Sequence, residues 1–254
     1  MKKIPEITVL FWVMKICATT LGETAGDLLS MTLNVGYAVS SIMLISGFFI
    51  TLIGQLFSKR YNPILYWTVI VSTSTAGTTM SDYMDRTLGL GYMYGSLILI
   101  TILLAILGLW RISEKSLSVT EIKTLKGEVF YWAAILFSNT LGTALGDFLA
   151  DDSGLGFAGG AILIGGLLAL VVLVKYFTKI STVLLFWVAF VLTRPFGATF
   201  GDLLTKSAER GGLGFGTGGS SLILFAILAS LMIYSSIKNN QTARLIQQST
   251  SCTD

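Results

Sequence analysis

Four aspartates occupy equivalent positions in an internal repeat. Each follows a glycine by five residues and a tryptophan by fifteen, in the copies Trp12–Gly22–Asp27, Trp67–Gly77–Asp82, Trp132–Gly142–Asp147 and Trp187–Gly197–Asp202. A repeated unit determines the architecture, so we read it first. Each aspartate ends a segment that otherwise reads as membrane-spanning, and ionisable groups at that depth are costly and commonly mark ion pathways. The four carboxylates are therefore the first candidates for a functional site.

Polar residues accompany the aspartate within each repeat. In the first repeat Thr20, Glu23, Thr24 and Asp27 recur at spacings of three and four residues, which predicts a stripe along one helical face. The third repeat supplies Asn139 in a comparable stripe. Hydroxyl and carboxylate oxygens suit hard cations or a proton path. We expect the stripes to line an ion pathway, with Glu23 and Asp27 as candidate metal ligands.

Three charges within the predicted spans occur only once. Lys15, Glu23 and Arg194 stand where the other repeats have neutral residues. Repetition explains the four aspartates, but it does not explain a charge that is present once. Lys15 and Glu23 are separated by about 12 Å along a helix, so their partners must come from other helices. We place all three in the pathway and expect Arg194 to pair with Glu23 or with a neighbouring aspartate.

A purely structural explanation of the repeated residues stays open. Small residues such as Gly22 let helices approach closely, and neighbouring hydroxyls bond across them. An aspartate near a helix end also binds backbone N–H groups of the following turn. The glycine-rich segments 156–160 and 214–219 are interpreted as close packing at a turn, since they lack the Lys-Ser/Thr ending of a phosphate loop. Solvated turns are expected for Asp85, Asp151 and Asp152.

The composition identifies the class of protein that must position these residues. The chain has 254 residues, 53% hydrophobic and 12% charged, with a mean hydropathy of +0.77, whereas soluble domains carry about 25% charged residues. Its apolar runs are continuous, which favours membrane helices over a β-barrel. The chain contains no histidine, which removes the imidazole metal ligand and the Ser–His dyad. We expect no cofactor and no nucleic-acid partner.

The predicted fold is an all-α integral membrane protein with eight transmembrane helices. These form four parallel two-helix hairpin repeats, with the pseudo-symmetry axis along the membrane normal. The predicted divisions are an N-terminal half over 1–110, a cytoplasmic linker over 111–128, a C-terminal half over 129–236 and a cytoplasmic tail over 237–254. The predicted spans are 7–29, 36–57, 63–84, 89–110, 129–150, 156–176, 181–204 and 213–236.

The distribution of lysine and arginine predicts the orientation. Twelve of these residues fall in the termini and loops of one side, whereas the opposite loops hold Arg86, Lys206 and Arg210. Cytoplasmic loops carry the excess of positive charge. We expect both termini to be cytoplasmic and the aspartates to lie toward the outside of a plasma membrane, with the first apolar segment retained as an uncleaved helix.

The motifs resemble those of a known bacterial family. The resemblance covers about residues 7–236 and rests on the recurring Trp, Gly and Asp and on the segment Phe11-Trp12…Thr19-Thr20-Leu21-Gly22-Glu23-Thr24…Asp27. That family consists of four-repeat membrane proteins, known as a repeat of unknown function and often labelled "uncharacterised membrane-anchored protein". The resemblance implies a bacterial inner-membrane protein with eight helices, and it supplies no substrate.

Three classes of function fit these residues. We favour a small secondary transporter for a cation, coupled to protons or another gradient, of which divalent metal efflux such as Mn²⁺ is one form. Its partners would be the lipid bilayer and a small inorganic cation or proton; a homo-oligomer stays open. The alternatives are a non-transporting scaffold or sensor and an intramembrane aspartyl enzyme. Four equivalent aspartates fit poorly with a specialised dyad, so we expect no enzyme.

Overall fold

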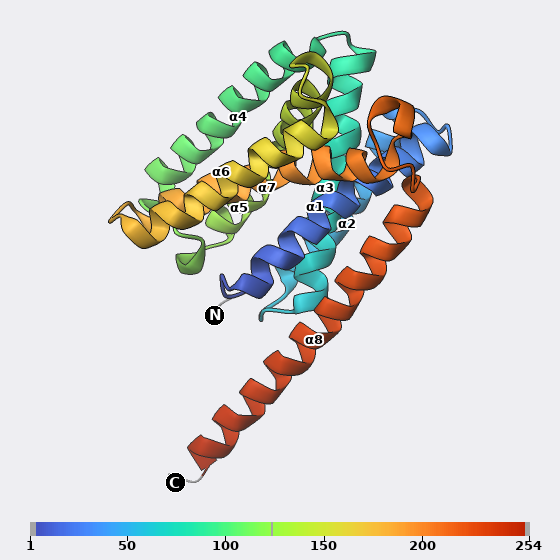
Figure 1. Cartoon of the computed structure of the whole chain (residues 1–254). Coiled ribbons are helices and arrows are strands. Elements are labelled where there is room, and N and C mark those ends of the chain that lie inside the picture. The colour runs from blue at the N-terminus through green and yellow to red at the C-terminus, as the bar shows by residue number, and fades with distance from the viewer. Residues whose placement is uncertain (1–3, 123, 252–254) are drawn as a thin grey trace.

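The computed structural model describes residues 4–122 and 124–251, which form an all-helical bundle of eight long α-helices (Figure 1). The helices lie close to the predicted spans. Their bounds are α1 (Val9–Asp27), α2 (Tyr37–Phe57), α3 (Pro63–Asp82), α4 (Gly91–Glu114), α5 (Leu125–Asp147), α6 (Gly156–Phe177), α7 (Thr182–Thr205) and α8 (Thr217–Ser251).

Side-chain caps set the starts of α1, α3 and α5. Thr8 Oγ1 accepts a hydrogen bond from the backbone N–H of Phe11, and Thr124 Oγ1 accepts one from Gly127 at 2.9 Å. Asn62 caps α3 in the same way and precedes a proline at the first helical position. Such side chains satisfy N–H groups that a helix start leaves without partners. Three of the four helices that carry the repeated aspartates therefore begin at a side-chain cap, whereas α7 begins after Ser181 without one.

The helices form two concentric shells. The inner shell is a closed ring in which α1 contacts α3, α3 contacts α5, α5 contacts α7, and α7 returns to α1. The outer helices lie against it, with α2 on α3, α4 on α5, α6 on α7 and α8 on α1. The second helix of each repeat thus packs mainly against the first helix of the next repeat, rather than against its own partner as a hairpin would. Short connections such as 58–62 and 178–181 hold these pairs as antiparallel neighbours.

The repeated glycine brings the inner helices into close contact. A Cβ added to any of the four would overlap the neighbouring helix, because each glycine lies against the same position of the next repeat. The contacts are Gly22 with Ser74, Gly77 with Asn139, Gly142 with Arg194 and Gly197 with Thr19. Small residues are what permit such approach in membrane bundles. The predicted role of these glycines in close packing is confirmed.

The glycine before or at the start of each second helix is required by its backbone conformation rather than by close packing. Gly36, Gly91, Gly156 and Gly214 have φ angles of 81°, 71°, 65° and 73°, and a Cβ added to any of them would meet nothing within 4 Å. Glycine is favoured there because L side chains rarely adopt this backbone conformation. The close-packing interpretation of the two glycine-rich segments is therefore wrong for Gly156 and Gly214, although Gly160 does pack against Thr199.

A π-helical turn follows the aspartate in the first three repeats. These turns span Leu28–Thr32, Tyr83–Thr87 and Phe148–Asp152, and each continues directly from α1, α3 or α5. In the fourth repeat α7 continues to Thr205, and a short 3₁₀ helix at Ala208–Arg210 lies in a longer connection. π-turns within helices occur frequently at functional sites. Here they place the residues after each aspartate against the ring.

The surface composition indicates a multi-pass membrane protein. Six helices are long and apolar enough to cross a membrane, namely α2, α4, α5, α6, α7 and α8. The outer helices expose large apolar side chains, among them Ile50 on α2 and Ile162 on α6. The α1 and α3 helices fall outside this group because Lys15, Glu23 and the many hydroxyl residues of α3 lower their hydropathy. Their polar side chains point into the ring, where they are buried.

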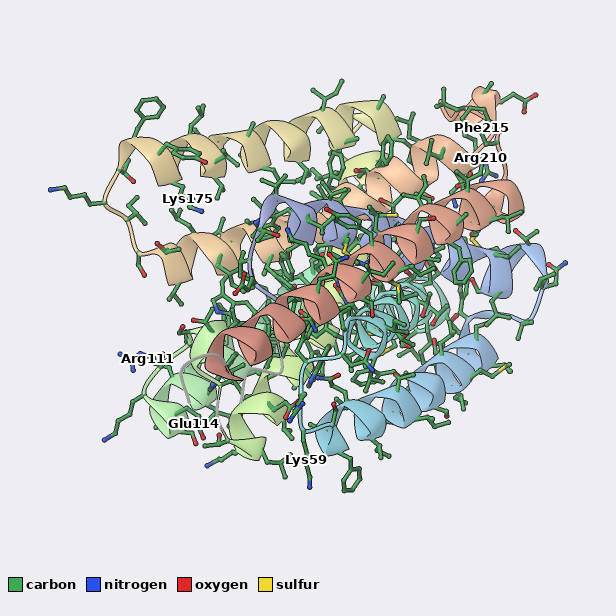
Figure 2. The ribbon with its side chains drawn as sticks, turned by 90° about the horizontal axis from the view of Figure 1, so that it is seen from below. Lys59, Arg111, Glu114, Lys175, Arg210 and Phe215 are labelled. Atoms are coloured by element: carbon green, nitrogen blue, oxygen red, sulfur yellow. The ribbon has the colours of Figure 1, made fainter. Side chains whose placement is uncertain are left out.

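The connecting loops gather at two ends of the bundle. Figure 2 shows Lys59, Arg111 and Lys175 toward one end and Arg210 and Phe215 toward the other. The repeated aspartates belong to the Arg210 end, because Asp202 and Arg210 line one pocket there. We call this the aspartate end. The separation of basic loops agrees with the expected alternation of the helices across the bundle.

The boundaries of the connecting segments differ from the predicted ones. The α4 helix runs to Glu114 and α5 begins at Leu125, so the expected linker 111–128 is shortened from both sides. The cytoplasmic tail over 237–254 stays a prediction; in its described part α8 continues as one helix to Ser251, and Figure 1 shows the helix extending beyond the bundle. Residues 252–254 of that predicted tail lie outside the described residues.

Aromatic residues close the ring at the opposite end, which we call the aromatic end. Trp67, Trp132 and Trp187 are buried, so the tryptophans act as packing residues within the bundle rather than as anchors at a membrane surface. The aromatic residue before each tryptophan contacts the tryptophan of an adjacent repeat. The ring-centroid distances are 5.5 Å for Phe11–Trp67, 5.5 Å for Tyr66–Trp132, 6.5 Å for Tyr131–Trp187 and 5.8 Å for Phe186–Trp12. We call these eight residues the aromatic layer.

Candidate functional site

The inner helices carry buried residues in stacked layers. On α1 the row is Phe11, Lys15, Thr19, Glu23 and Asp27, whose spacing of four keeps them near one helical face. The equivalent residues of α3, α5 and α7 complete each layer. From the aromatic layer outward, these are Lys15, Ile70, Ile135 and Phe190; then Thr19, Ser74, Asn139 and Arg194; then Glu23, Thr78, Thr143 and Ala198; then the four aspartates.

Glu23 and Arg194 form an ion pair in the middle of this stack. Arg194 Nη1 lies 2.9 Å from Glu23 Oε2, and both side chains are buried. Arg194 Nη2 also donates hydrogen bonds to Thr78 Oγ1 at 2.5 Å and Thr143 Oγ1 at 2.7 Å. The predicted pairing of Arg194 with Glu23 across the bundle is confirmed. The two positions at which the repeat is broken therefore meet.

Lys15 lies two turns below Glu23, toward the aromatic end. Its Nζ donates to Asn139 Oδ1 at 3.5 Å and lies 3.9 Å from the centroid of the Phe190 ring. Asn139 Nδ2 in turn donates to Thr73 Oγ1 at 2.9 Å and Ser74 Oγ at 3.3 Å. The partners of Lys15 come from α5 and α7, as expected from its distance to Glu23. Asn139 orients the amine within a neutral network.

Arg86 bridges two of the repeated aspartates. Its Nε lies 2.9 Å from Asp82 Oδ1, and its Nη2 lies 3.2 Å from Asp147 Oδ2. Tyr37 and Tyr92 surround the guanidinium, with ring centroids 6.0 and 5.7 Å from Cζ. This cation comes from the turn after α3, which was expected to lie in a solvated loop.

Lys206 bridges the other two aspartates. Its Nζ lies 2.6 Å from Asp27 Oδ2 and 3.0 Å from Asp202 Oδ1. Burial disfavours the charged amine, but the carboxylates of Asp202 and Asp27 outweigh this effect and raise the pKa of Lys206. Lys206 is 120 residues after Arg86, which is the same offset that relates the two halves of the chain. The two bridges, which we call the aspartate clamps, are therefore related by the internal two-fold symmetry.

Three carboxylates could hold a metal ion between the clamps and the buried ion pair. One oxygen from each of Glu23, Asp147 and Asp202 lies within 4.8 Å of the others, and all three residues are buried. Carboxylate oxygens are the ligands that hard divalent cations prefer. Asp27, which was predicted to be a ligand together with Glu23, is not part of this group. The group, which we call the carboxylate triad, shares Glu23 with the predicted metal pair and adds Asp147 and Asp202.

A pocket of about 350 Å³ opens over this site at the aspartate end. It is lined by both clamp cations, by Asp202 and by Met31, Ala150, Asp151, Gly156, Phe157 and Arg210. Met31 and Asp151 occupy the repeat position that Arg86 and Lys206 occupy in the other two repeats. The pocket, whose lining is of mixed charge, thus reaches the triad at Asp202.

Comparison with known families assigns the repeat. The model of the Repeat of Unknown Function (DUF347) matches residues 10–61, 65–116, 130–181 and 185–239. The chain belongs to this family. Each DUF347 repeat comprises one inner helix and the outer helix that follows it. A search among curated proteins and a search among solved structures gave no significant match.

Some predicted site residues lie away from the triad. The hydroxyl of Thr20 donates to Ile16 O, and Thr24 accepts a hydrogen bond from Ser221 on α8. Thr20 and Thr24 therefore lie beside the inward-facing row of α1, which passes through Thr19. Asp85 is also corrected, because it is buried rather than solvated and accepts a hydrogen bond from Ser81.

Four residues of the site, Thr78, Thr143, Arg86 and Lys206, have roles that the repeat pattern does not predict. The hydroxyls of Thr78 and Thr143 hold the Arg194 guanidinium, and they occupy the Glu23 position of their own DUF347 repeats. A usable signal existed for the clamps. In the second and fourth repeats a cation follows the aspartate by four residues, which places the two side chains on the same helical face.

Proposed function

We propose that this DUF347 protein is a small secondary transporter for a cation. Its eight helices would span the inner membrane, with both termini cytoplasmic and the aspartate end outward. The observation that carries the proposal is the carboxylate triad of Glu23, Asp147 and Asp202, buried inside a ring of helices beneath an open pocket. Buried carboxylates at this depth are a feature of ion pathways.

The charge of the site favours a cation over an anion. Five carboxylates, on Glu23 and the four aspartates, face four basic side chains, on Lys15, Arg86, Arg194 and Lys206. An arriving divalent cation can replace the clamp cations as the counter-charge of these carboxylates. An anion would add to their negative charge without gaining a free cation. Mn²⁺ is a suitable probe because it accepts oxygen ligands.

The arrangement also supports transport by alternating access. The pocket at the aspartate end reaches the triad at Asp202, whereas the aromatic layer lies across the ring at the other end. Movement of a cation through the ring would require the aromatic layer to separate. The sequence contains no nucleotide-binding motif, so we propose that a proton or ion gradient supplies the energy.

Uptake into proteoliposomes tests the proposal. Purified protein is reconstituted, and Mn²⁺, Mg²⁺, Ca²⁺, Zn²⁺ and Na⁺ are offered under imposed pH gradients. We expect Glu23→Gln and Asp147→Asn each to reduce cation movement by about tenfold or more, because each removes a triad ligand. Asp152→Asn is the matched control, since it removes an exposed carboxylate from the same turn at a position outside the pocket lining. Failure of the wild type to move any of these cations, or unchanged transport in both triad variants, would contradict the proposal.

We propose no catalytic role for the aspartates. Each is bound to Arg86 or Lys206, whereas an aspartyl dyad requires two carboxylates that share a proton. A scaffold or sensor is the remaining alternative, and it would be the conclusion if cations bound without crossing the membrane. The buried charges favour transport, because a passive bundle has no need of them.

A further inference from the structure

Lys15 is a buried amine without a carboxylate partner. Its side chain is fully buried, and among the described residues no carboxylate lies within ion-pair distance of it. Its contacts are the neutral Asn139 amide oxygen and the face of the Phe190 ring. An ammonium held in this way has lost its water and gained only weak compensation. Its protonation must therefore depend on the other charges inside the ring.

The helices around Lys15 present one charged group to it. Arg194 on α7 acts on the amine through its positive charge. Across α5 and α3 the contacts are neutral, through Asn139 and the hydroxyls that Asn139 binds. Between α8 and α1, the backbone carbonyl of Leu224 accepts a hydrogen bond from the Cys17 thiol. In the aromatic layer, Tyr66 and Tyr131 share a hydrogen bond of 2.6 Å between their hydroxyls.

A chain of contacts joins the amine to the carboxylate triad. Lys15 binds Asn139, Asn139 binds Ser74, and the Ser74 carbonyl accepts from Arg194 at 3.4 Å. Arg194 completes the chain through its ion pair with Glu23. The state of Glu23 therefore determines how much positive charge Arg194 presents to Lys15.

Binding of a cation to Glu23 would change that balance. The Glu23 carboxylate would turn to the metal, and the Arg194 guanidinium would lose its counter-charge while it stays buried. Two uncompensated positive charges, on Arg194 and Lys15, would then share one low-dielectric interior, which is strongly unfavourable. Arginine does not lose its proton in proteins, whereas a buried lysine readily does. Lys15 is the group that can relieve the repulsion.

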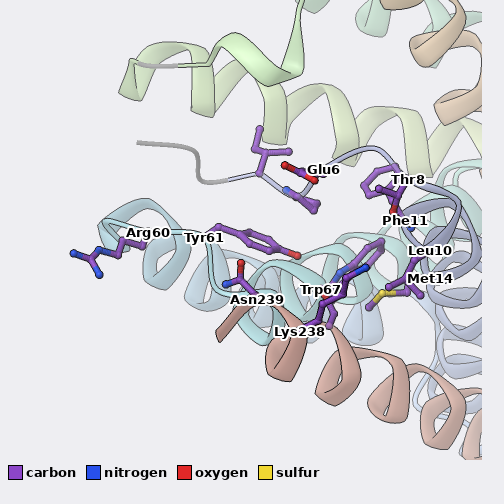
Figure 3. Close-up of a pocket in the computed structure, with 13 residues that line it drawn as sticks. Glu6, Thr8, Leu10, Phe11, Met14, Arg60, Tyr61, Trp67, Lys238 and Asn239 are labelled. Carbon is purple, nitrogen blue, oxygen red and sulfur yellow. Dashed lines mark hydrogen bonds between the residues drawn. The ribbon is translucent and has the colours of Figure 1, made fainter. Parts of the chain in front are cut away.

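We propose that Lys15 is the proton-coupling residue of the transport cycle, which releases its proton when a divalent cation binds the triad and regains one when the cation leaves. The proposal rests on the proposed transport function. The proton leaves the ammonium for water, and the nitrogen keeps the electron pair as a neutral amine. A cavity of about 520 Å³ opens at the aromatic end (Figure 3). Its lining includes Phe11, Trp67 and Met14, the residue that precedes Lys15 on α1. Lys15 would therefore regain its proton from the aromatic end after the cation has left and release it toward the pocket that admits the cation, so that protons and cations cross in opposite directions.

Proteoliposomes with an entrapped pH dye test this coupling, with Mn²⁺ as the probe. In the wild type an imposed pH gradient should drive Mn²⁺ uphill, and Mn²⁺ flux should move protons in the opposite direction. In Lys15→Met, Mn²⁺-for-Mn²⁺ exchange should persist, while uphill movement driven by the pH gradient should fall by about tenfold or more. Ile135→Met is the matched control, because it alters the equivalent position of the third repeat. It should stay coupled.

A second measurement covers the case in which Lys15→Met does not fold. Mn²⁺ is added to purified protein in weakly buffered detergent solution, and the released protons are counted. The wild type should release more protons than Lys15→Arg, in which the permanent charge should also weaken Mn²⁺ binding by about tenfold. Equal proton release by the wild type and Lys15→Arg, or unchanged pH-driven transport in Lys15→Met, overturns the proposal. A wild type that moves no cation contradicts the transport function itself, whereas coupled transport by Lys15→Met overturns only the role of Lys15.

Discussion

The guanidinium of Arg194 lies 2.9 Å from the carboxylate of Glu23, although the two residues come from opposite ends of the chain. Each stands at a position that the other repeats fill with a neutral residue. Because both are buried, neither charge is compensated by water, and each depends on the other and on the hydroxyls of Thr78 and Thr143. The pair thus links the stability of the ring to the occupancy of the triad.

Removal of either partner should destabilise the protein strongly. We expect Glu23→Gln or Arg194→Met to cost about 3–5 kcal/mol, because the remaining charge would be buried without a partner. The double variant should cost less than the sum of the two. Thermal unfolding in detergent, followed by tryptophan fluorescence, measures the three variants, with the exposed Asp152→Asn as control. Additive losses would show that the two charges do not interact in the folded protein.

The aspartate clamps should compete with a bound cation. Lys206→Met removes the counter-charge of Asp202, so Mn²⁺ should bind about tenfold more tightly than in the wild type, a difference of about 1.4 kcal/mol. Arg86→Met should act similarly through Asp147, since the two cations occupy equivalent positions. Lys206→Arg retains the charge and is the control. Titration calorimetry measures these affinities, and weaker binding by Lys206→Met would rule out competition.

The repeat pattern predicted much of this fold because it encodes local structure and helix contact. Long apolar segments predicted eight helices, and the recurring glycine predicted the close approach that Gly22 makes with Ser74. The pairing of Arg194 with Glu23 was predictable for an energetic reason. A single buried charge needs a partner, and few candidates of opposite sign exist within the spans.

Other features depend on three-dimensional arrangement that spacing does not determine. Each outer helix contacts the inner helix of the next repeat rather than that of its own repeat. This choice depends on how the inner ring closes, and the sequence of a single repeat does not reveal it. The predicted stripe placed Glu23 and Asp27 on the inward row, but Thr20 and Thr24 lie beside that row, which passes through Thr19. Arg86 and Lys206 lie outside the inner helices and fold back over them, so the assignment of turn residues to solvent missed them.

The four repeated glycines at the contacts between inner helices should tolerate no added side chain. They are Gly22, Gly77, Gly142 and Gly197. In Gly77→Ala the new Cβ would lie 3.0 Å from the Asn139 carbonyl carbon, so α3 and α5 would have to separate. We expect a loss of about 1–3 kcal/mol, typical of overpacking in a closely packed interior. Gly47→Ala is the matched control, because its Cβ meets nothing within 4 Å in α2. Thermal unfolding compares the two variants, and equal stability would contradict the proposal that Gly77 is needed for the close contact of α3 and α5.

Asp85 should make stability depend on pH. Its carboxyl lies against Gly95 of α4, and burial raises its pKa to about 6, although the Ser81 hydroxyl and Arg86 act in the opposite direction. The unfolded chain has a carboxyl pKa of about 3.9, so the folded state binds this proton more tightly. The stabilisation from Asp85 is therefore fully present below about pH 4 and is lost as the pH rises through about 6.

Asp85→Asn should remove this dependence. The variant carries no charge to bury, so it should match the wild type near pH 4 and exceed its unfolding temperature above pH 6, with a constant difference at higher pH. Unfolding temperatures measured between pH 4 and 8 give the difference at each pH, which cancels the titration of the other carboxylates. Asp152→Asn provides the control because Asp152 is exposed in a comparable turn. A difference between Asp85→Asn and the wild type that did not change with pH would show that the Asp85 carboxyl titrates alike in the folded and unfolded protein.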